Sequence, residues 1–128
     1  MSIHIVQLGS PRHRGEGLRI GTVRHPPRGV PKSKFASQNW YDLWFPNLAP
    51  SPKLLKQAHA ATTEKEFAAF LRKYHAEMSD PEKSRELDLL AALSHTANFS
   101  VGCYCEEESH CHRSALRQLL KDRGAKLA

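Results

Sequence analysis

Residues 98–122 read NFSVGCYCEEESHCHRSALRQLLKD, and they give the clearest indication of the fold class. Its first part, 98–105, is short, apolar and bounded by polar residues, which is typical of a buried strand. Residues 106–110 are polar and predict a loop, and the leucine spacing within 111–122 predicts a helix. A strand that leads through a loop into a helix indicates parallel pairing with neighbouring strands. The sequence therefore predicts an α/β fold.

Two more strands are predicted near the N-terminus. The segments IHIVQL (3–8) and LRIGTV (18–23) both fit short strands. Residues 25–39 contain three prolines, which remove backbone donors and exclude a central strand or a helix interior. We therefore expect a long ordered loop there. The aromatic cluster at 40–45 is expected to cover the sheet or the mouth of a pocket.

Helices are predicted in the middle of the chain. The dipeptide Ser51-Pro52 is typical of an N-cap followed by the first helical position. Thr63 and Glu66 have the spacing of a capping box at the start of a clearer helix. A third helix is predicted to begin at Pro81.

Together these elements predict a small, mostly parallel sheet flanked by helices, in a Rossmann-like three-layer arrangement. A chain of 128 residues with a hydrophobic fraction of 40% fits a single domain over residues 1–128. No apolar run approaches the length of about 18 residues that a membrane helix needs. The N-terminal segment MSIHIVQLGSPRHRG also lacks the pattern of a signal peptide. We therefore expect a cytoplasmic protein without a membrane partner.

The basic residues are clustered. The net charge is +6, and residues 12–34 hold seven Lys and Arg against one acid, Glu16. A second basic cluster lies at 113–126. Such clustering favours an anionic small molecule or nucleic acid as partner, although it is also compatible with an ordinary basic surface. A non-catalytic nucleic-acid-binding module is one alternative function, for which affinity would fall steeply with salt.

The start of the last helix is the strongest candidate site. Open α/β sheets bind ligands beyond the carboxyl ends of their strands, and a helix start presents free N–H groups there. We predict that Cys111 and His112 carry any catalysis and that Arg24, Arg28 and Arg113 bind an anion, such as the phosphate of a nucleotide. On this interpretation Cys111 alkylates faster than the other two cysteines.

Metal binding is an alternative use of the same segment. The cluster at 103–112 contains suitable ligands, namely Cys103, Cys105, His110, Cys111 and His112. Their spacing is not a usual two-knuckle zinc pattern, so the leading interpretation includes no metal and no cofactor. A structural role is favoured for Cys103 and Cys105, which share one face of the predicted strand and would be small buried hydrophobes.

The stretch GLRIGTVRHPPRGV (17–30) resembles the opening of the YeaO-like family of uncharacterised proteins. Similar patterns follow in the same order at 48–51, at 67–77 and at the Cys-His-Arg that opens the last helix. The resemblance covers roughly residues 3–121. It implies a fold but no activity, because the family has no established function. The chain has Val23 and Pro26 where the family pattern has an aspartate and a tryptophan.

Overall fold

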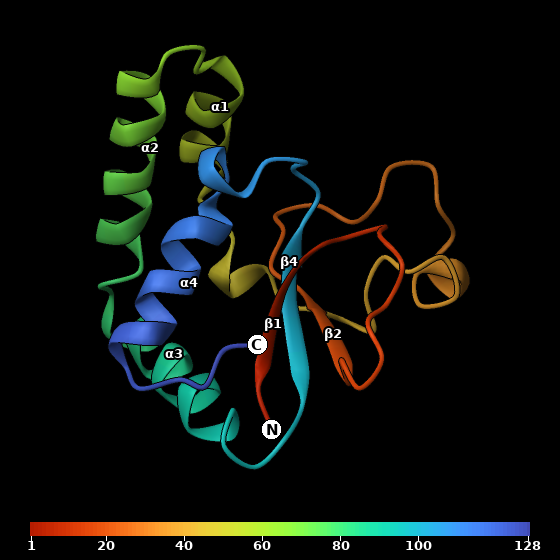
Figure 1. Ribbon diagram of the computed structural model, residues 1–128. Helices are drawn as coiled ribbons and strands as arrows, with labels where there is room; N and C mark the ends of the chain where they lie inside the picture. The colour runs from red at the N-terminus through yellow and green to blue at the C-terminus, as the bar shows by residue number, and fades with distance from the viewer.

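The computed structural model describes residues 1–128 and confirms the α/β fold (Figure 1). Each predicted strand and helix is present, with ends that differ by a few residues from the expected ones. The strands are β1 (Ile3–Gln7), β2 (Leu18–Gly21), β3 (Leu43–Trp44) and β4 (Phe99–Cys103). The helices are α1 (Pro52–Ala60), α2 (Glu64–Glu77), α3 (Pro81–Leu93) and α4 (His112–Asp122).

The sheet has the order β1-β4-β2-β3, and every pair of neighbours is parallel. The last strand of the chain therefore lies between the first two. In this register Val101 is the partner of both Ile5 and Ile20. All five residues of β4 are buried, as expected for the central strand of a covered sheet.

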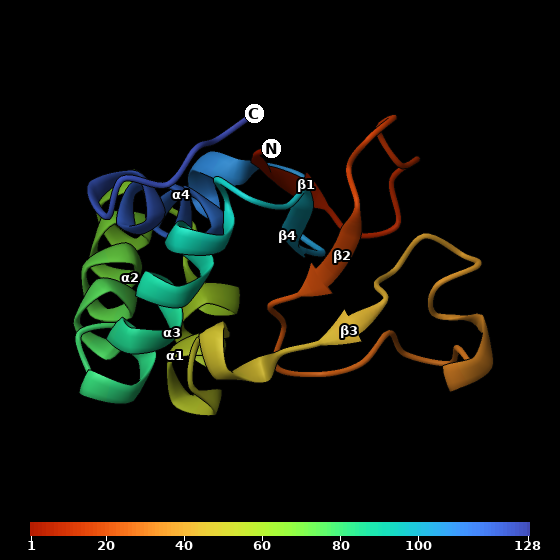
Figure 2. The same ribbon diagram turned by 90° about the horizontal axis from the view of Figure 1, so that it is seen from below.

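All four helices pack on one face of the sheet, as Figures 1 and 2 show. Their apolar side chains form one core with Ile3, Ile20 and Val101 from the strands. Because strand side chains alternate, Gly21 faces the opposite side, where the ring of Tyr41 lies against it. A Cβ atom at Gly21 would come within 2.4 Å of that ring. The segment between β2 and β3 thus covers the second face, so the third layer is an ordered loop instead of helices.

A buried ion pair ties that loop to the sheet. Arg19, on β2, is fully buried and its Nε lies 2.7 Å from Glu16 Oε2. One of its Nη atoms donates to the backbone carbonyls of Ser10, at 2.9 Å, and Asn39, at 2.8 Å. Ser100, on β4, donates its hydroxyl to the same Glu16 carboxylate. Three separate parts of the chain are joined by this network.

Helix capping follows the predictions. The Ser51 side chain accepts a hydrogen bond from Leu54 N, and both bonds of the Thr63–Glu66 capping box are formed. The short strand β3 was not predicted, because its two residues lie within the aromatic segment. No helix has the length and apolar character required to cross a membrane.

Candidate functional site

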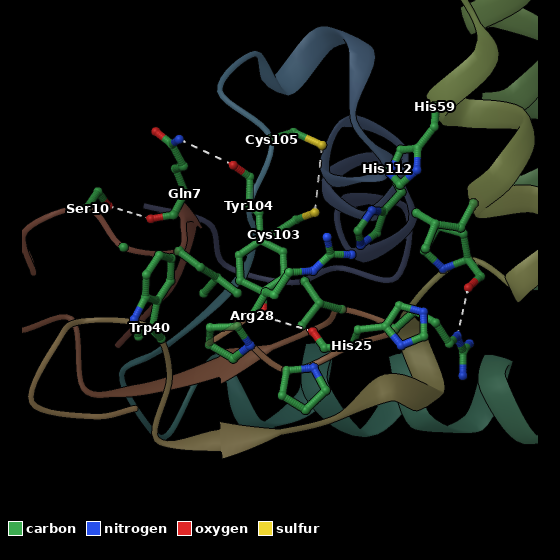
Figure 3. A pocket seen from close by; sticks show the side chains of 18 residues that line it. Gln7, Ser10, His25, Arg28, Trp40, His59, Cys103, Tyr104, Cys105 and His112 are labelled. Carbon is green, nitrogen blue, oxygen red and sulfur yellow. Dashed lines mark hydrogen bonds between the residues drawn. The ribbon is translucent and has the colours of Figure 1, made fainter. Parts of the chain in front are cut away.

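A cavity of about 660 Å³ lies at the carboxyl edge of the sheet (Figure 3). Its walls come mainly from the residues that directly follow β1, β2 and β4, where parallel sheets bind ligands. The lining residues are Gln7 to Ser10, Val23 to Arg28, Trp40, Pro50, Leu55, His59, Cys103 to Cys105 and His112.

The side chains of this lining are basic and aromatic. The cations are the guanidinium groups of Arg24 and Arg28, and no aspartate or glutamate takes part. Three histidines, His25, His59 and His112, also line the cavity. The remaining wall includes three prolines, the rings of Trp40 and Tyr104, aliphatic side chains and two cysteines. A cavity with cationic groups and without carboxylates favours an anionic occupant.

The loop 24–28 is fixed in place over the cavity. Arg24 donates from Nε to the carbonyl of Pro50, at 3.0 Å, and from an Nη atom to that of Ala49. Tyr104, just beyond β4, donates its hydroxyl to the carbonyl of His25 at 2.8 Å. Arg28 is exposed and makes neither an ion pair nor a side-chain hydrogen bond. Arg24 therefore positions the loop, whereas the guanidinium of Arg28 is available to a ligand.

His112 forms part of the cavity floor and is itself 3% exposed. Its Nε2 lies 2.8 Å from the carbonyl oxygen of Thr22. Because a carbonyl can only accept, this contact places the ring proton on Nε2 and leaves Nδ1 with a free lone pair. That Nδ1 lies 3.7 Å from Cys111 Sγ.

The three cysteines are reduced and lie next to one another. Cys103 and Cys111 are buried, whereas Cys105 is exposed, and the sulfurs of Cys103 and Cys105 are 3.8 Å apart. The hydrogen bond with Cys105 raises the pKa of Cys103. The bond with Cys103 in turn lowers the pKa of Cys105 and of Cys111. The cluster thus favours loss of a proton from Cys105 or Cys111 over loss from Cys103.

The predicted site residues divide into two groups. Arg24, Arg28 and His112 line the large cavity together. Cys111 and Arg113 do not, although Cys111 lines a smaller adjoining cavity of about 220 Å³. Arg113 is 4% exposed and donates to the carbonyl of Cys105 at 2.6 Å, so its guanidinium points into the protein.

The family model described as the active DUF488-N3 subclade matches residues 3–124. The chain belongs to this family. The DUF488 family includes the YeaO-like proteins, so the predicted resemblance is confirmed. No curated protein and no solved structure shows significant similarity to the chain. The match covers the entire cavity and the cysteine cluster of this DUF488-N3 protein, while its description names no reaction and no ligand.

Cys105 is exposed at the cavity, and the prediction that it is buried is wrong. The predicted strand extended to residue 105, which made Cys105 a buried neighbour of Cys103, but β4 ends at Cys103. Beyond that point side chains no longer alternate, and Cys105 is exposed while Cys103 is buried. The basic loop 24–28, which approaches the same strand end, is the signal that could have indicated an accessible thiol here.

We predict that iodoacetamide modifies Cys105 of this DUF488-N3 protein at least about tenfold faster than Cys103 or Cys111. The buried thiols react only after local opening, and an opening of about 1.4 kcal/mol already slows labelling tenfold. Tandem mass spectrometry of the native protein at short labelling times measures the three rates. The Cys105→Ser variant should lose the fast phase. A fast phase on Cys111 would contradict the exposure argument.

Proposed function

We propose that this chain is a cytoplasmic protein that binds a small phosphate-bearing ligand, such as a nucleotide, in the large cavity. One observation carries the proposal. A cavity at the carboxyl edge of a parallel sheet combines two arginines and three histidines with no carboxylate. Ligands of α/β proteins occupy this edge, and the lining charge selects for an anion.

The size and walls of the cavity suit a nucleotide. Its volume of about 660 Å³ is within the range of roughly 300–1,000 Å³ that small-molecule sites occupy. Trp40 and Tyr104 are in edge-to-face contact on one wall, with ring centroids 5.9 Å apart. Aromatic faces of this kind can stack on a nucleobase. The basic loop 24–28 would then hold the phosphate.

Each predicted residue receives a role in this proposal. Arg28 contacts the phosphate directly, since its guanidinium has no protein partner and can bind two oxygens at once. Arg24 fixes the loop and adds charge. His112 and Cys105 face the ligand from the floor, where any chemistry would occur. Cys111 and Arg113 position these two residues. Cys111 contacts the His112 ring, and Arg113 donates to the carbonyl of Cys105.

Arg28→Glu is expected to weaken nucleotide binding by at least about tenfold. A hydrogen bond to a charged group contributes about 1.5–3 kcal/mol, and the new carboxylate also repels the phosphate. Isothermal titration calorimetry with nucleoside monophosphates and diphosphates, and with the corresponding nucleosides, measures the effect. Only the phosphorylated members should bind.

Arg72→Glu is the matched control, because it makes the same charge change at an exposed position on α2 outside the cavity lining. It should retain the affinity of the unsubstituted chain. Binding that Arg28→Glu and Arg72→Glu reduce equally would indicate a general charge effect. That result, or the absence of binding by every phosphorylated probe, would reject the cavity as the anion site.

A further inference from the structure

Three buried side chains with metal-ligating atoms converge beneath the large cavity. Cys103 ends β4, Cys111 precedes α4, and His112 begins α4. One ligand atom from each residue lies within 4.8 Å of the other two, and all three residues are buried. Two thiols and an imidazole are the ligand types that bind zinc, and here they lie close enough to share one ion.

The separations fit a tetrahedral ion. Zinc binds sulfur at about 2.3 Å and imidazole nitrogen at about 2.0 Å, so its tetrahedral ligand atoms lie roughly 3.5–3.8 Å apart. Cys111 Sγ and His112 Nδ1 are 3.7 Å apart. The remaining separations, up to 4.8 Å, require movements of about 1 Å, which side-chain rotation supplies.

The imidazole is already oriented for coordination. The Thr22 carbonyl holds the proton on Nε2 of His112, so Nδ1 presents its lone pair to the thiol of Cys111. A backbone acceptor on the distal ring nitrogen is the usual outer partner of a metal-bound histidine. Thr22 is itself fully buried, and its hydroxyl donates to the carbonyl of Gly102 on β4. The outer partner is therefore anchored to the central strand.

We propose that Cys103, Cys111 and His112 bind a zinc ion whose fourth position faces the smaller cavity where it adjoins the large one. A donor set of two thiolates and one imidazole suits zinc, and three protein ligands with one open position are typical of catalytic zinc sites. All three residues line the smaller cavity, and Cys103 and His112 also line the large one, so the open side is directed to the junction of the two cavities. Cys105 is exposed beside the site and is not a ligand. The zinc site does not require the proposed nucleotide binding.

The linear spacing of the ligands conceals this arrangement. The chain lacks the two closely spaced ligand pairs of a usual zinc motif, and its sequence therefore favours an interpretation without metal. In the fold, the end of a strand and the start of the next helix meet, and the loop between them places Cys111 beside Cys103. The ligands come from two elements instead of from one compact loop.

The experiment measures metal on the full chain, purified without a histidine tag. Zinc content after reloading and dialysis should be about one ion per chain. Cys111→Ser and His112→Gln should each weaken zinc binding, measured against a chelating dye, by more than the roughly 10–100-fold typical of losing an outer partner. Replacement by cobalt should give the intense visible bands of tetrahedral thiolate coordination, which detect the ligands directly.

Two variants serve as controls. Cys105→Ser and His59→Ala remove a neighbouring thiol and a cavity histidine outside the trio, and both should retain about one zinc ion per chain. Circular dichroism of each variant shows that a loss of metal is not a loss of fold. Failure of the folded unsubstituted chain to bind zinc would overturn the proposal. An equally large loss of zinc in Cys105→Ser and in Cys111→Ser would also overturn it. Cys105 would then be a fourth protein ligand, and no open position would remain. Neither readout involves a nucleotide, so it is independent of the proposed function.

Discussion

Arg19→Met is expected to lower the free energy of unfolding by about 3–5 kcal/mol, the range for breaking one side of a buried ion pair. The substitution leaves the carboxylate of Glu16, which is 2% exposed, without its cation. It also removes the donors to the carbonyls of Ser10 and Asn39. Because a domain of this size is stable by only about 5–15 kcal/mol, the loss is a large part of the total.

Urea unfolding at pH 7 measures this loss. Burial alone would raise the pKa of Glu16, but hydrogen bonds from Arg19, from the backbone N–H of His13 and from Ser100 outweigh it and lower the pKa from 4.5 to about 2. A lowered pKa stabilises the fold above the unfolded value and ceases to do so as the pH falls from 4.5 towards 2. At pH 7 the carboxylate is ionised, and the network contributes fully.

Arg12→Met provides the control, because Arg12 forms a more exposed ion pair with Asp42 at 2.8 Å. Such pairs contribute about 1 kcal/mol or less. In addition, Arg19→Met combined with Glu16→Gln should be less destabilising than the sum of the two single changes, since no uncompensated charge remains. If Arg19→Met and Arg12→Met lower the free energy of unfolding equally, the buried network contributes no more than a more exposed ion pair.

Gly17→Ala is expected to destabilise the protein by at least about 3 kcal/mol. Gly17 precedes β2 with a φ of +77°, in the left-handed region that favours glycine. A Cβ atom would lie 2.0 Å from the backbone oxygen of Asn98. That atom belongs to the backbone and cannot rotate away, so either β2 or the start of β4 must move.

Gly15→Ala separates the cost of the left-handed backbone conformation from the cost of the steric clash. Gly15 has nearly the same φ, +76°, and a Cβ atom added there would meet nothing within 4 Å. It should therefore show only the backbone penalty of about 1–2 kcal/mol. Thermal and urea unfolding of both variants give the comparison. If Gly17→Ala is no worse than Gly15→Ala, the close approach of Asn98 does not constrain the sheet.

The predictions that succeeded depend on local chemistry. Ser51 and Thr63 cap their helices because the bonding partners lie three residues ahead in the chain. The strands and the parallel pairing followed from short apolar segments and from the terminal strand-loop-helix unit. In contrast, the strand order and the two-residue β3 depend on contacts between distant segments, which one sequence does not reveal.

The structure brings some of the predicted site residues together, whereas the roles assigned to them stay predictions. Arg24, Arg28 and His112 do meet at one cavity, because parallel strands end at a common edge. Arg113 was expected beside them, but its position in the first turn of α4 directs the side chain inward to Cys105. The network around Arg19 could not be foreseen either. Glu16 stands out in the sequence only as the single acid in a basic segment, and the other members of the network, Ser10, Asn39 and Ser100, are distributed along the chain.

The placement of β4 between β1 and β2 also has a consequence for folding during translation. During synthesis β1 and β2 emerge about 80 residues before the strand that joins them, and they have no backbone hydrogen bonds to each other in the finished sheet. Contacts this distant in sequence form slowly. Until translation is nearly finished, the nascent chain therefore holds β1 without a neighbour and β2 with only the two-residue β3 beside it, which is the interval when chaperones act and aggregation begins. The cavity and the cysteine cluster come into being only in that final step, when β4 closes the sheet.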